Sequence, residues 1–179
     1  ILGTKLGTTL QREHEVGVFM EELVKSISPK FAVLLLADGE KKELRPVVCH
    51  GLDRPLQTTL PIGMDPRRWL IENGVQLPEE GDPRFYIVPI TVEKELFGVV
   101  CVLSSLDPSA REDLEEELIF VKSAANYLAP ILRNITRYET LLEHHGEMVR
   151  LLSLLGALSQ ELMLREEIEA VLEDIARKT

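Results

Sequence analysis

The hydrophobic positions along this chain change their spacing several times, and each change marks the border of an element. Over residues 1–27 the apolar side chains recur at steps of three and four, with glutamates and lysines between them. This spacing predicts an amphipathic helix. Ser28-Pro29 is expected to end the helix, because the residue before a proline avoids helical backbone angles.

Two apolar runs then predict a β-hairpin. They span residues 30–38 and 41–53, and Asp38-Gly39 lies between them, a dipeptide that is frequent in hairpin turns. Pro46 lies inside the second run. Since proline cannot donate a hydrogen bond to a neighbouring strand, we expect a sheet edge or a bulge at this residue.

A short helix is predicted within residues 58–78. Asp65 is a good N-cap, Pro66 suits the first helical position, and Gly74 suits the position after the last turn. Three consecutive residues of this helix are expected to face the interior, namely Trp69, Leu70 and Ile71.

A second hairpin is predicted over residues 85–107, which read FYIVPITVEKELFGVVCVLSSLD. Two strongly apolar runs flank a charged turn in this segment. Pro89 suits a bulge or an unpaired position, and Gly98 permits close approach of a neighbouring backbone or helix. We therefore interpret these two residues as structural.

From Ser109 a helical pattern continues almost to the end of the chain. Its apolar positions alternate steps of four and three, as in a coiled coil. Pro130 is expected to bend the helix, and a register change or break is expected near residues 144–146. The positions assigned to a dimer interface are Leu114, Leu118, Val121, Ala125, Leu128, Leu132, Ile135, Leu142, Val149 and Leu152.

This apolar stripe is longer than a single sheet would cover. If the helix only covered the sheet, its apolar stripe would end near Ile131, but the pattern continues. An apolar surface of this length is rarely left exposed to water and usually marks a contact with a partner. The simplest cover is a second copy of the same helix. We therefore expect a homodimer through helices, in which the first helix joins the bundle.

The order helix, hairpin, short helix, hairpin, long helix predicts an α+β fold. Strands that come in hairpins form an antiparallel sheet, here with the N- and C-terminal helices on one face. The predicted division is 1–29 for the N-terminal helix of the dimer bundle, 30–108 for the sheet domain, 109–145 for the closing helix and coiled coil, and 146–179 for an amphipathic helix leading into a further domain.

In this order the segments resemble a GAF domain, the small sensor module of bacterial signalling proteins. The resemblance covers about residues 10–135. It rests on FAVLLLADGEKKELRPVVCHGLD for the first hairpin, GMDPRRWLIENGVQLP for the short pocket-side helix, FYIVPI followed by FGVVCVLSSLD for the second hairpin, and SAREDLEEELIFVKSAANYLAPIL for the closing helix. The resemblance implies a cytoplasmic sensory domain of a signal-transduction protein, such as a sensor histidine kinase of a two-component system.

The segment that roofs the ligand pocket in ligand-binding GAF domains is short in this chain. Only EEGDPRFY separates the proline-ended strand from the Val-Pro-Ile strand, which leaves little material for pocket walls. A cyclic nucleotide or a bilin is therefore not expected, whereas a small metabolite or no ligand is. The best candidates for a ligand site are Arg67, Arg68 and Trp69, at the start of a helix whose N-terminus favours anions. The alternative is two solvated arginines and one core tryptophan.

The composition excludes some partners. The 179 residues carry a formal net charge of -10, which repels phosphate backbones, so we expect no nucleic-acid partner. No apolar run approaches the roughly 18 residues of a membrane span, so we expect no membrane contact by this fragment. Because the chain begins with Ile1 and stops at Thr179 within a helical pattern, we expect it to be part of a longer protein.

The residue types that carry catalysis or bind metals are sparse. Cys49 and Cys101 lie in apolar strand patterns, which favours buried thiols in a reducing compartment over a disulfide or a reactive pair. His50 follows Cys49 without further ligands at usable spacing. The adjacent residues His144 and His145 point about 100° apart on a helix. No metal, cofactor or catalytic residue is predicted.

The resulting hypothesis is a non-catalytic sensory domain that relays a small-molecule or packing signal to an output domain after Thr179. One alternative is a structural dimerisation module without a ligand. Another is an enzyme of the GAF fold that reduces methionine sulfoxide, for which two cysteines are too few.

Overall fold

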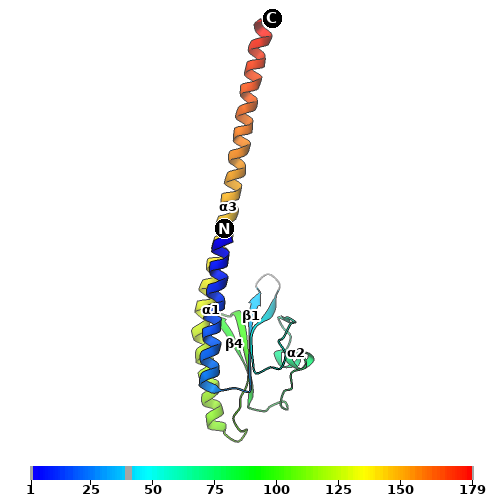
Figure 1. The fold of residues 1–179 in the computed structure, drawn as a ribbon, viewed down its shortest axis with the longest axis vertical. Coiled ribbons are helices and arrows are strands. Elements are labelled where there is room, and N and C mark those ends of the chain that lie inside the picture. Colours follow the sequence, from blue (N-terminus) through cyan, green and yellow to red (C-terminus); the bar gives the residue numbers. More distant parts are fainter. Residues whose placement is uncertain (1, 39–41, 179) are drawn as a thin grey trace.

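The computed structural model describes residues 2–38 and 42–178, with side chains for residues 11–38 and 42–160. Figure 1 shows α1 and α3 side by side along one face of a sheet, with α2 on the opposite face and α3 projecting far beyond the sheet. The elements are α1 (Leu2–Ile27), β1 (Phe31–Asp38), β2 (Glu43–His50), β3 (Leu60–Pro61), α2 (Pro66–Glu72), β4 (Phe85–Val92), β5 (Glu95–Leu103) and α3 (Arg111–Lys178).

The five strands form one antiparallel sheet in the order β3-β2-β1-β5-β4. This arrangement confirms the predicted α+β fold with the two terminal helices on one face. Within the described residues, none of the helices has the continuous apolar stretch that a bilayer crossing requires.

The central strand β1 is shared by two hydrophobic cores. Ala32 and Leu34 belong to the core between the sheet and the long helices, whereas Val33 and Leu35 belong to the core between the sheet and α2. All four are fully buried, because successive side chains of a strand point to opposite faces. Burial on both faces explains why this segment is a continuous apolar run in the sequence.

The first hairpin contains the predicted irregularity. The register between β1 and β2 shifts next to Pro46, and β3 pairs only with Glu43 and Leu44 of β2. Pro46 therefore lies at a bulge, on a part of β2 that faces no further strand among the described residues. Gly39 of the predicted turn lies outside the described residues.

Gly98 is where three strands come close together. It lies in β5, opposite Leu36 of β1 and Ile90 of β4. A Cβ atom built on Gly98 would lie only 2.5 Å from the carbonyl oxygen of Leu35. The prediction that this glycine permits close backbone approach is confirmed.

Helix α2 is capped as its sequence predicts. A carboxylate oxygen of Asp65 accepts a hydrogen bond from the backbone N–H of Arg67 at 3.0 Å, and Gly74 follows the helix with φ of 81°. Trp69 and Leu70 are buried, but Ile71 is 53% exposed. The prediction for Ile71 was wrong because Trp69 and Leu70 already occupy the narrow face that so short a helix turns to the sheet.

Helix α3 runs from Arg111 to Lys178 without interruption and includes Pro130. The break expected near residues 144–146 is absent. A single glycine costs a helix only about 1 kcal/mol relative to alanine, and Gly146 is flanked by long helical segments on both sides. The border predicted at residue 146 therefore does not coincide with a helix end.

Candidate functional site

The first half of α3 forms a wall of the protein's own core. Of the residues assigned to a dimer interface, Val121, Ala125, Leu128 and Leu132 pack into the core with the sheet and α1. Leu114 and Ile135 are also buried, and Leu118 packs against the same core. Within one protomer, this burial already explains the apolar character of these positions.

The remaining members of that set lie farther along α3. Leu142 is half-buried, whereas Val149 and Leu152 are 48% and 61% exposed. A dimer interface through these residues stays a prediction, and only this later part of the set has surface to offer a partner.

A buried carboxylate ties the start of α3 to the sheet. Glu117 is only 6% exposed. Its Oε1 accepts a hydrogen bond from the hydroxyl group of Tyr86 in β4 at 2.8 Å, and its Oε2 accepts one from the hydroxyl group of Ser104 at 2.9 Å. Ser104 directly follows β5 and also accepts a hydrogen bond from the backbone N–H of Leu106. We call Tyr86, Glu117 and Ser104 the clamp.

Sequence reasoning missed the clamp because Glu117 is the last of three consecutive glutamates, a residue type that is mostly solvent-exposed. A signal was present in the spacing. Glu117 follows Leu114 by three residues and precedes Val121 by four, so it occupies the buried face of the helix. A carboxylate on that face requires hydrogen-bond donors, and Tyr86 and Ser104 supply them.

The clamp predicts a specific loss of stability at alkaline pH. Burial, reinforced by the hydrogen bond to Glu117, raises the pKa of Tyr86 well above its ordinary value near 10. The folded protein therefore keeps this phenol protonated after the unfolded chain releases the proton, and stability falls as the pH rises above about 10. Tyr86→Phe should cost about 0.5–1.5 kcal/mol at neutral pH and make the alkaline loss shallower.

Urea unfolding at several pH values measures this effect. Tyr127→Phe is the matched control at a dilution that keeps the chain monomeric, because Tyr127 is 75% exposed on α3 in the protomer and its replacement should then leave the alkaline loss unchanged. Equal pH profiles for Tyr86→Phe and the wild-type chain would contradict the role assigned to the clamp.

A second contact links α3 to the turn between β4 and β5. Arg133 pairs with Glu93 at 3.4 Å. Glu93 and Lys94 have φ angles of 51° and 74°. The turn therefore adopts the left-handed conformation that is usual in two-residue hairpins, although neither residue is a glycine. The first third of α3 is thus attached at both ends of the β4–β5 hairpin.

The three residues proposed as a ligand site do not converge. Trp69 is a core residue whose indole N–H donates to the carbonyl oxygen of Thr59 at 3.1 Å. Arg68 points to solvent and pairs with Glu72 at 2.9 Å. Arg67 lies over the ring of Phe85, 5.3 Å from its centre, and donates to the carbonyl oxygen of Pro78. Arg68 is thus a solvated arginine and Trp69 a core tryptophan, as in the alternative to a ligand site. Arg67 instead holds the connector between α2 and β4, residues 73–84, in place.

The connector is also held by its own ion pair. Arg84 forms several hydrogen bonds with the carboxylate of Asp82, the shortest at 2.6 Å. These bonds lower the pKa of Asp82 to about 2. The short segment that could have formed a pocket roof is therefore held by the pair Asp82–Arg84 within it and by the hydrogen bond from Arg67 of α2 to Pro78.

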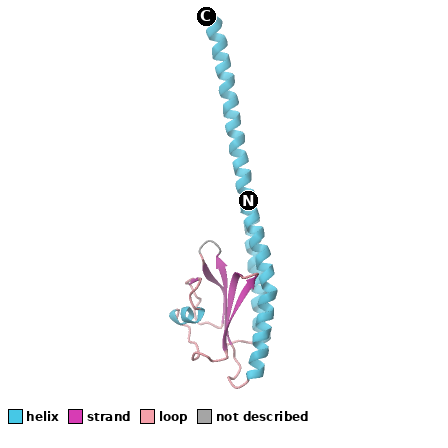
Figure 2. Cartoon of the chain, turned by 180° about the vertical axis from the view of Figure 1, so that it is seen from behind, coloured by secondary structure: helices cyan, strands magenta, loops and turns pink. Residues whose placement is uncertain are grey.

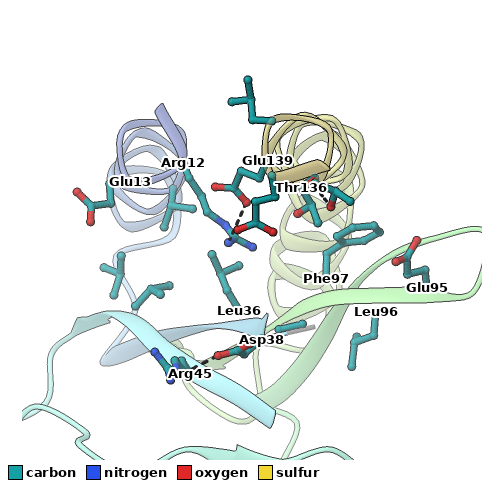
Figure 3. A pocket seen from close by; sticks show the side chains of 17 residues that line it. Arg12, Glu13, Leu36, Asp38, Arg45, Glu95, Leu96, Phe97, Thr136 and Glu139 are labelled. Atoms are coloured by element: carbon teal, nitrogen blue, oxygen red, sulfur yellow. Dashed lines mark hydrogen bonds and ion pairs between the residues drawn. The ribbon is translucent and has the colours of Figure 1, made fainter. Parts of the chain in front are cut away.

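A groove opens between the two long helices and the sheet, next to the end of β1 (Figure 3). Its volume is about 890 Å³, within the size range of small-molecule sites. Arg12 of α1 and Glu139 of α3 face each other across it at 3.8 Å. Two buried atoms in its wall, Arg12 Nε and Thr136 Oγ1, lack a hydrogen-bond partner among the described residues.

Among the described residues that line the groove, carboxylates outnumber guanidinium groups. The lining includes five carboxylates and two guanidinium groups, which belong to Glu13, Asp38, Glu95, Glu139 and Glu143 and to Arg12 and Arg45. Sequence reasoning did not find this groove because its walls come from five elements that are distant in the sequence.

The cysteines and histidines lie apart from the groove lining. Cys101 is fully buried, and this burial raises the pKa of its thiol to about 12, which makes it a weak nucleophile at neutral pH. Cys49 is half-buried on β2. Within the described part of the chain, no three histidine, cysteine or acidic side chains gather in a way that could hold a metal ion.

No family model and no curated protein sequence matches this chain. The solved structures that are similar to it in shape include the following three. The GAF domain of the Acinetobacter phosphoenolpyruvate-protein phosphotransferase is 12% identical, with a TM-score of 0.48 over 75% of this chain and 95% of that one. A fragment comprising residues 122 to 287 of a methyl-accepting chemotaxis protein is 18% identical, with a TM-score of 0.38 over 65% and 91%.

The third structure is the GAF domain/HD domain protein from Geobacter sulfurreducens. It is 13% identical to this chain, with a TM-score of 0.50, and the match covers 69% of this chain and 93% of that one. Identity at this level speaks for the fold alone. The five-stranded antiparallel sheet flanked by α1 and α3 has the fold of a GAF domain, here continued by a long C-terminal helix.

Proposed function

We propose that this chain is a non-catalytic regulatory GAF domain that works as a homodimer and passes the state of its sheet to an output domain through α3. The observation that carries the proposal is the continuity of α3. The same helix that forms a wall of the core up to Ile135 continues without interruption to Lys178. At a rise of 1.5 Å per residue it extends roughly 60 Å beyond its last core contact.

The attachments of α3 support a mechanical relay. The clamp fixes the start of the helix to β4 and β5, and Arg133 fixes its next part to the β4–β5 turn. A helix held by packed side chains and a few polar contacts moves by small shifts and rotations between discrete arrangements. A change in the sheet or in the groove therefore has a direct route to the C-terminal end of α3.

The groove is our candidate entry point for a small-molecule signal. It lies where α1, α3 and the sheet meet, so a bound molecule would alter the separation of these three elements. The alternative of a structural module without a ligand remains open. In that case the clamp and the groove would hold α3 in one position, with no second arrangement.

Distances between two copies of α3 test the relay. A spin label on Ser153→Cys, introduced together with Cys49→Ala, reports the separation of the two helices in the dimer by pulsed electron paramagnetic resonance. Glu117→Leu removes both acceptors of the clamp and should shift the label-to-label distance by about 1–2 Å or more, the usual size of helix shifts in switching proteins. Circular dichroism confirms that the variant is folded.

Glu116→Leu is the matched control, because Glu116 neighbours Glu117 on the same turn but is exposed. Its distance distribution should equal that of the parent. Tyr86→Phe removes one clamp bond and should give an intermediate shift, which keeps the test available if Glu117→Leu does not fold. Identical distributions for all variants would favour the structural module over the relay.

A further inference from the structure

Helix α3 carries a second series of apolar positions, separate from those that face the sheet. At intervals of seven residues the series contains Phe120, Tyr127, Asn134, Leu141, Met148 and Leu155. A parallel series contains Ala124, Ile131, Tyr138, His145 and Leu152, so that Asn134 and His145 are the polar members of the two series. Together they alternate steps of four and three over 36 residues. We call these two series the outer seam.

The outer seam is uncovered in the protomer. Its large side chains are exposed by 40% at Phe120, 75% at Tyr127, 66% at Leu141 and 57% at Met148. Figure 2 shows α3 next to the sheet and, beyond α1 and the sheet, projecting with no other described element beside it. The outer seam therefore presents apolar side chains to solvent both beside the sheet and beyond it.

The spacing of the outer seam defines the shape of what covers it. A period of 3.5 residues stays aligned only with another helix that winds around α3, because a straight surface would lose contact as the stripe turns. Seven large side chains with 40–75% exposure present on the order of 800 Å², which is the area that each partner buries in a standard specific interface. The occupant is thus a helix of comparable length.

The charges along this part of α3 favour a second copy of the same chain. Between residues 141 and 158 the charged side chains other than histidine are Glu143, Glu147 and Arg150. At 100° per residue all three project from the side of the helix opposite to the outer seam. A pair of identical helices would therefore bring apolar faces together without burying an ionised carboxylate or guanidinium group.

Asn134 sets the orientation of such a pair. It is the amide residue within the outer seam. In a parallel, in-register pair it meets its own copy, and each amide has both a donor and an acceptor to offer the other. An antiparallel pair centred on the apolar part around residues 141–155 would place Asn134 against apolar side chains, which leaves its amide without a partner.

We propose that two copies of this chain pair in parallel and in register through the outer seam, and that the apolar positions facing the sheet take no part in the pairing. This inference rests on the proposed homodimer and specifies its surface. In this arrangement both sheets lie on the outside of the helix pair, and the two C-terminal ends of α3 leave it side by side.

Two variants at similar exposure test the surface. Leu155 belongs to the outer seam and not to the dimer positions first predicted, and it is 59% exposed, whereas Leu154 lies on the other side of the helix and is 55% exposed. Leu155→Glu should weaken dimerisation at least tenfold in sedimentation equilibrium, and Leu154→Glu should leave it unchanged. Both side chains are solvent-exposed in the protomer, so neither change should disturb the fold, and circular dichroism checks this.

Cysteine cross-linking tests the orientation. Leu155→Cys should form an intermolecular disulfide under mild oxidation, because equivalent positions meet only in a parallel, in-register pair, and Leu154→Cys should not. If the chain dimerises but Leu155→Glu has no effect, or Leu154→Cys cross-links in place of Leu155→Cys, the outer seam is wrong and the proposed homodimer stands. A wild-type chain that stays monomeric at high micromolar concentration would overturn both.

Discussion

Replacing Leu132 by alanine should lower the free energy of unfolding by about 2–5 kcal/mol, the usual cost of truncating a fully buried leucine. Leu132 is fully buried and packs in the core between the long helices and the sheet. The loss has two parts, the hydrophobic transfer of the removed atoms and the cavity that they leave. Urea unfolding followed by circular dichroism measures it.

Leu154→Ala provides the comparison on the same helix. Leu154 is 55% exposed and belongs neither to the face toward the sheet nor to the outer seam, so its replacement should change stability by less than about 0.5 kcal/mol. If Leu132 instead lined a dimer interface, its replacement would act mainly on the association constant, and the measured cost would depend strongly on protein concentration. Equal costs for the two variants would contradict the packing described for α3.

Gly98→Ala should lower the free energy of unfolding by about 1–3 kcal/mol, the usual cost of overpacking. The new methyl group would lie 2.5 Å from the carbonyl oxygen of Leu35 and 3.0 Å from a methyl carbon of Leu36. The nearer of these atoms belongs to the backbone of the central strand, which cannot move without disturbing its pairing with both neighbours.

Gly156→Ala is the control of opposite sign. Gly156 lies in α3, where an added methyl group meets nothing within 4 Å, and alanine favours a helix over glycine by roughly 1 kcal/mol. The midpoint temperature of thermal unfolding should therefore fall for Gly98→Ala. It should hold or rise for Gly156→Ala. A neutral Gly98→Ala would mean that β1 and β5 are less closely spaced than described.

The two hairpins of the sheet could be predicted because each is encoded by its own neighbours in the sequence, whereas the two-residue strand β3 was not predicted. The proline at the bulge in β2, the Asp65 cap of α2 and the close approach at Gly98 each follow from the conformational limits of one residue type. The same holds for the antiparallel pairing within each hairpin, since two strands joined by a short turn must run in opposite directions. These signals are local, and the fold confirms them.

The function of each side of α3 could not be predicted in the same way. The seven-residue series through Leu114 and Val121 and the one through Phe120 and Tyr127 have the same period. Periodicity shows that a face is apolar and does not show what covers it. Packing against the sheet determines which of the two faces is buried. This packing consists of contacts between residues far apart in the chain.

The candidate sites show the same limit. The cluster around Arg67 was inferred from the start of a helix, but the side chains of a single turn point in different directions, and these three have separate partners. The clamp and the groove draw their residues from several elements. Only Glu117, a carboxylate at a buried helical position, gave a signal that the sequence alone could have supplied.

The position of the clamp near one extremity of so long a rod gives α3 the properties of a lever with its fulcrum at Glu117. From Glu117 to Lys178 the helix measures roughly 90 Å at 1.5 Å per residue. A tilt of about 2° at the fulcrum would therefore displace the far tip by roughly 3 Å, given that rise per residue. A rearrangement of the sheet too slight to break a hydrogen bond could thus be amplified into a displacement that a neighbouring domain would register.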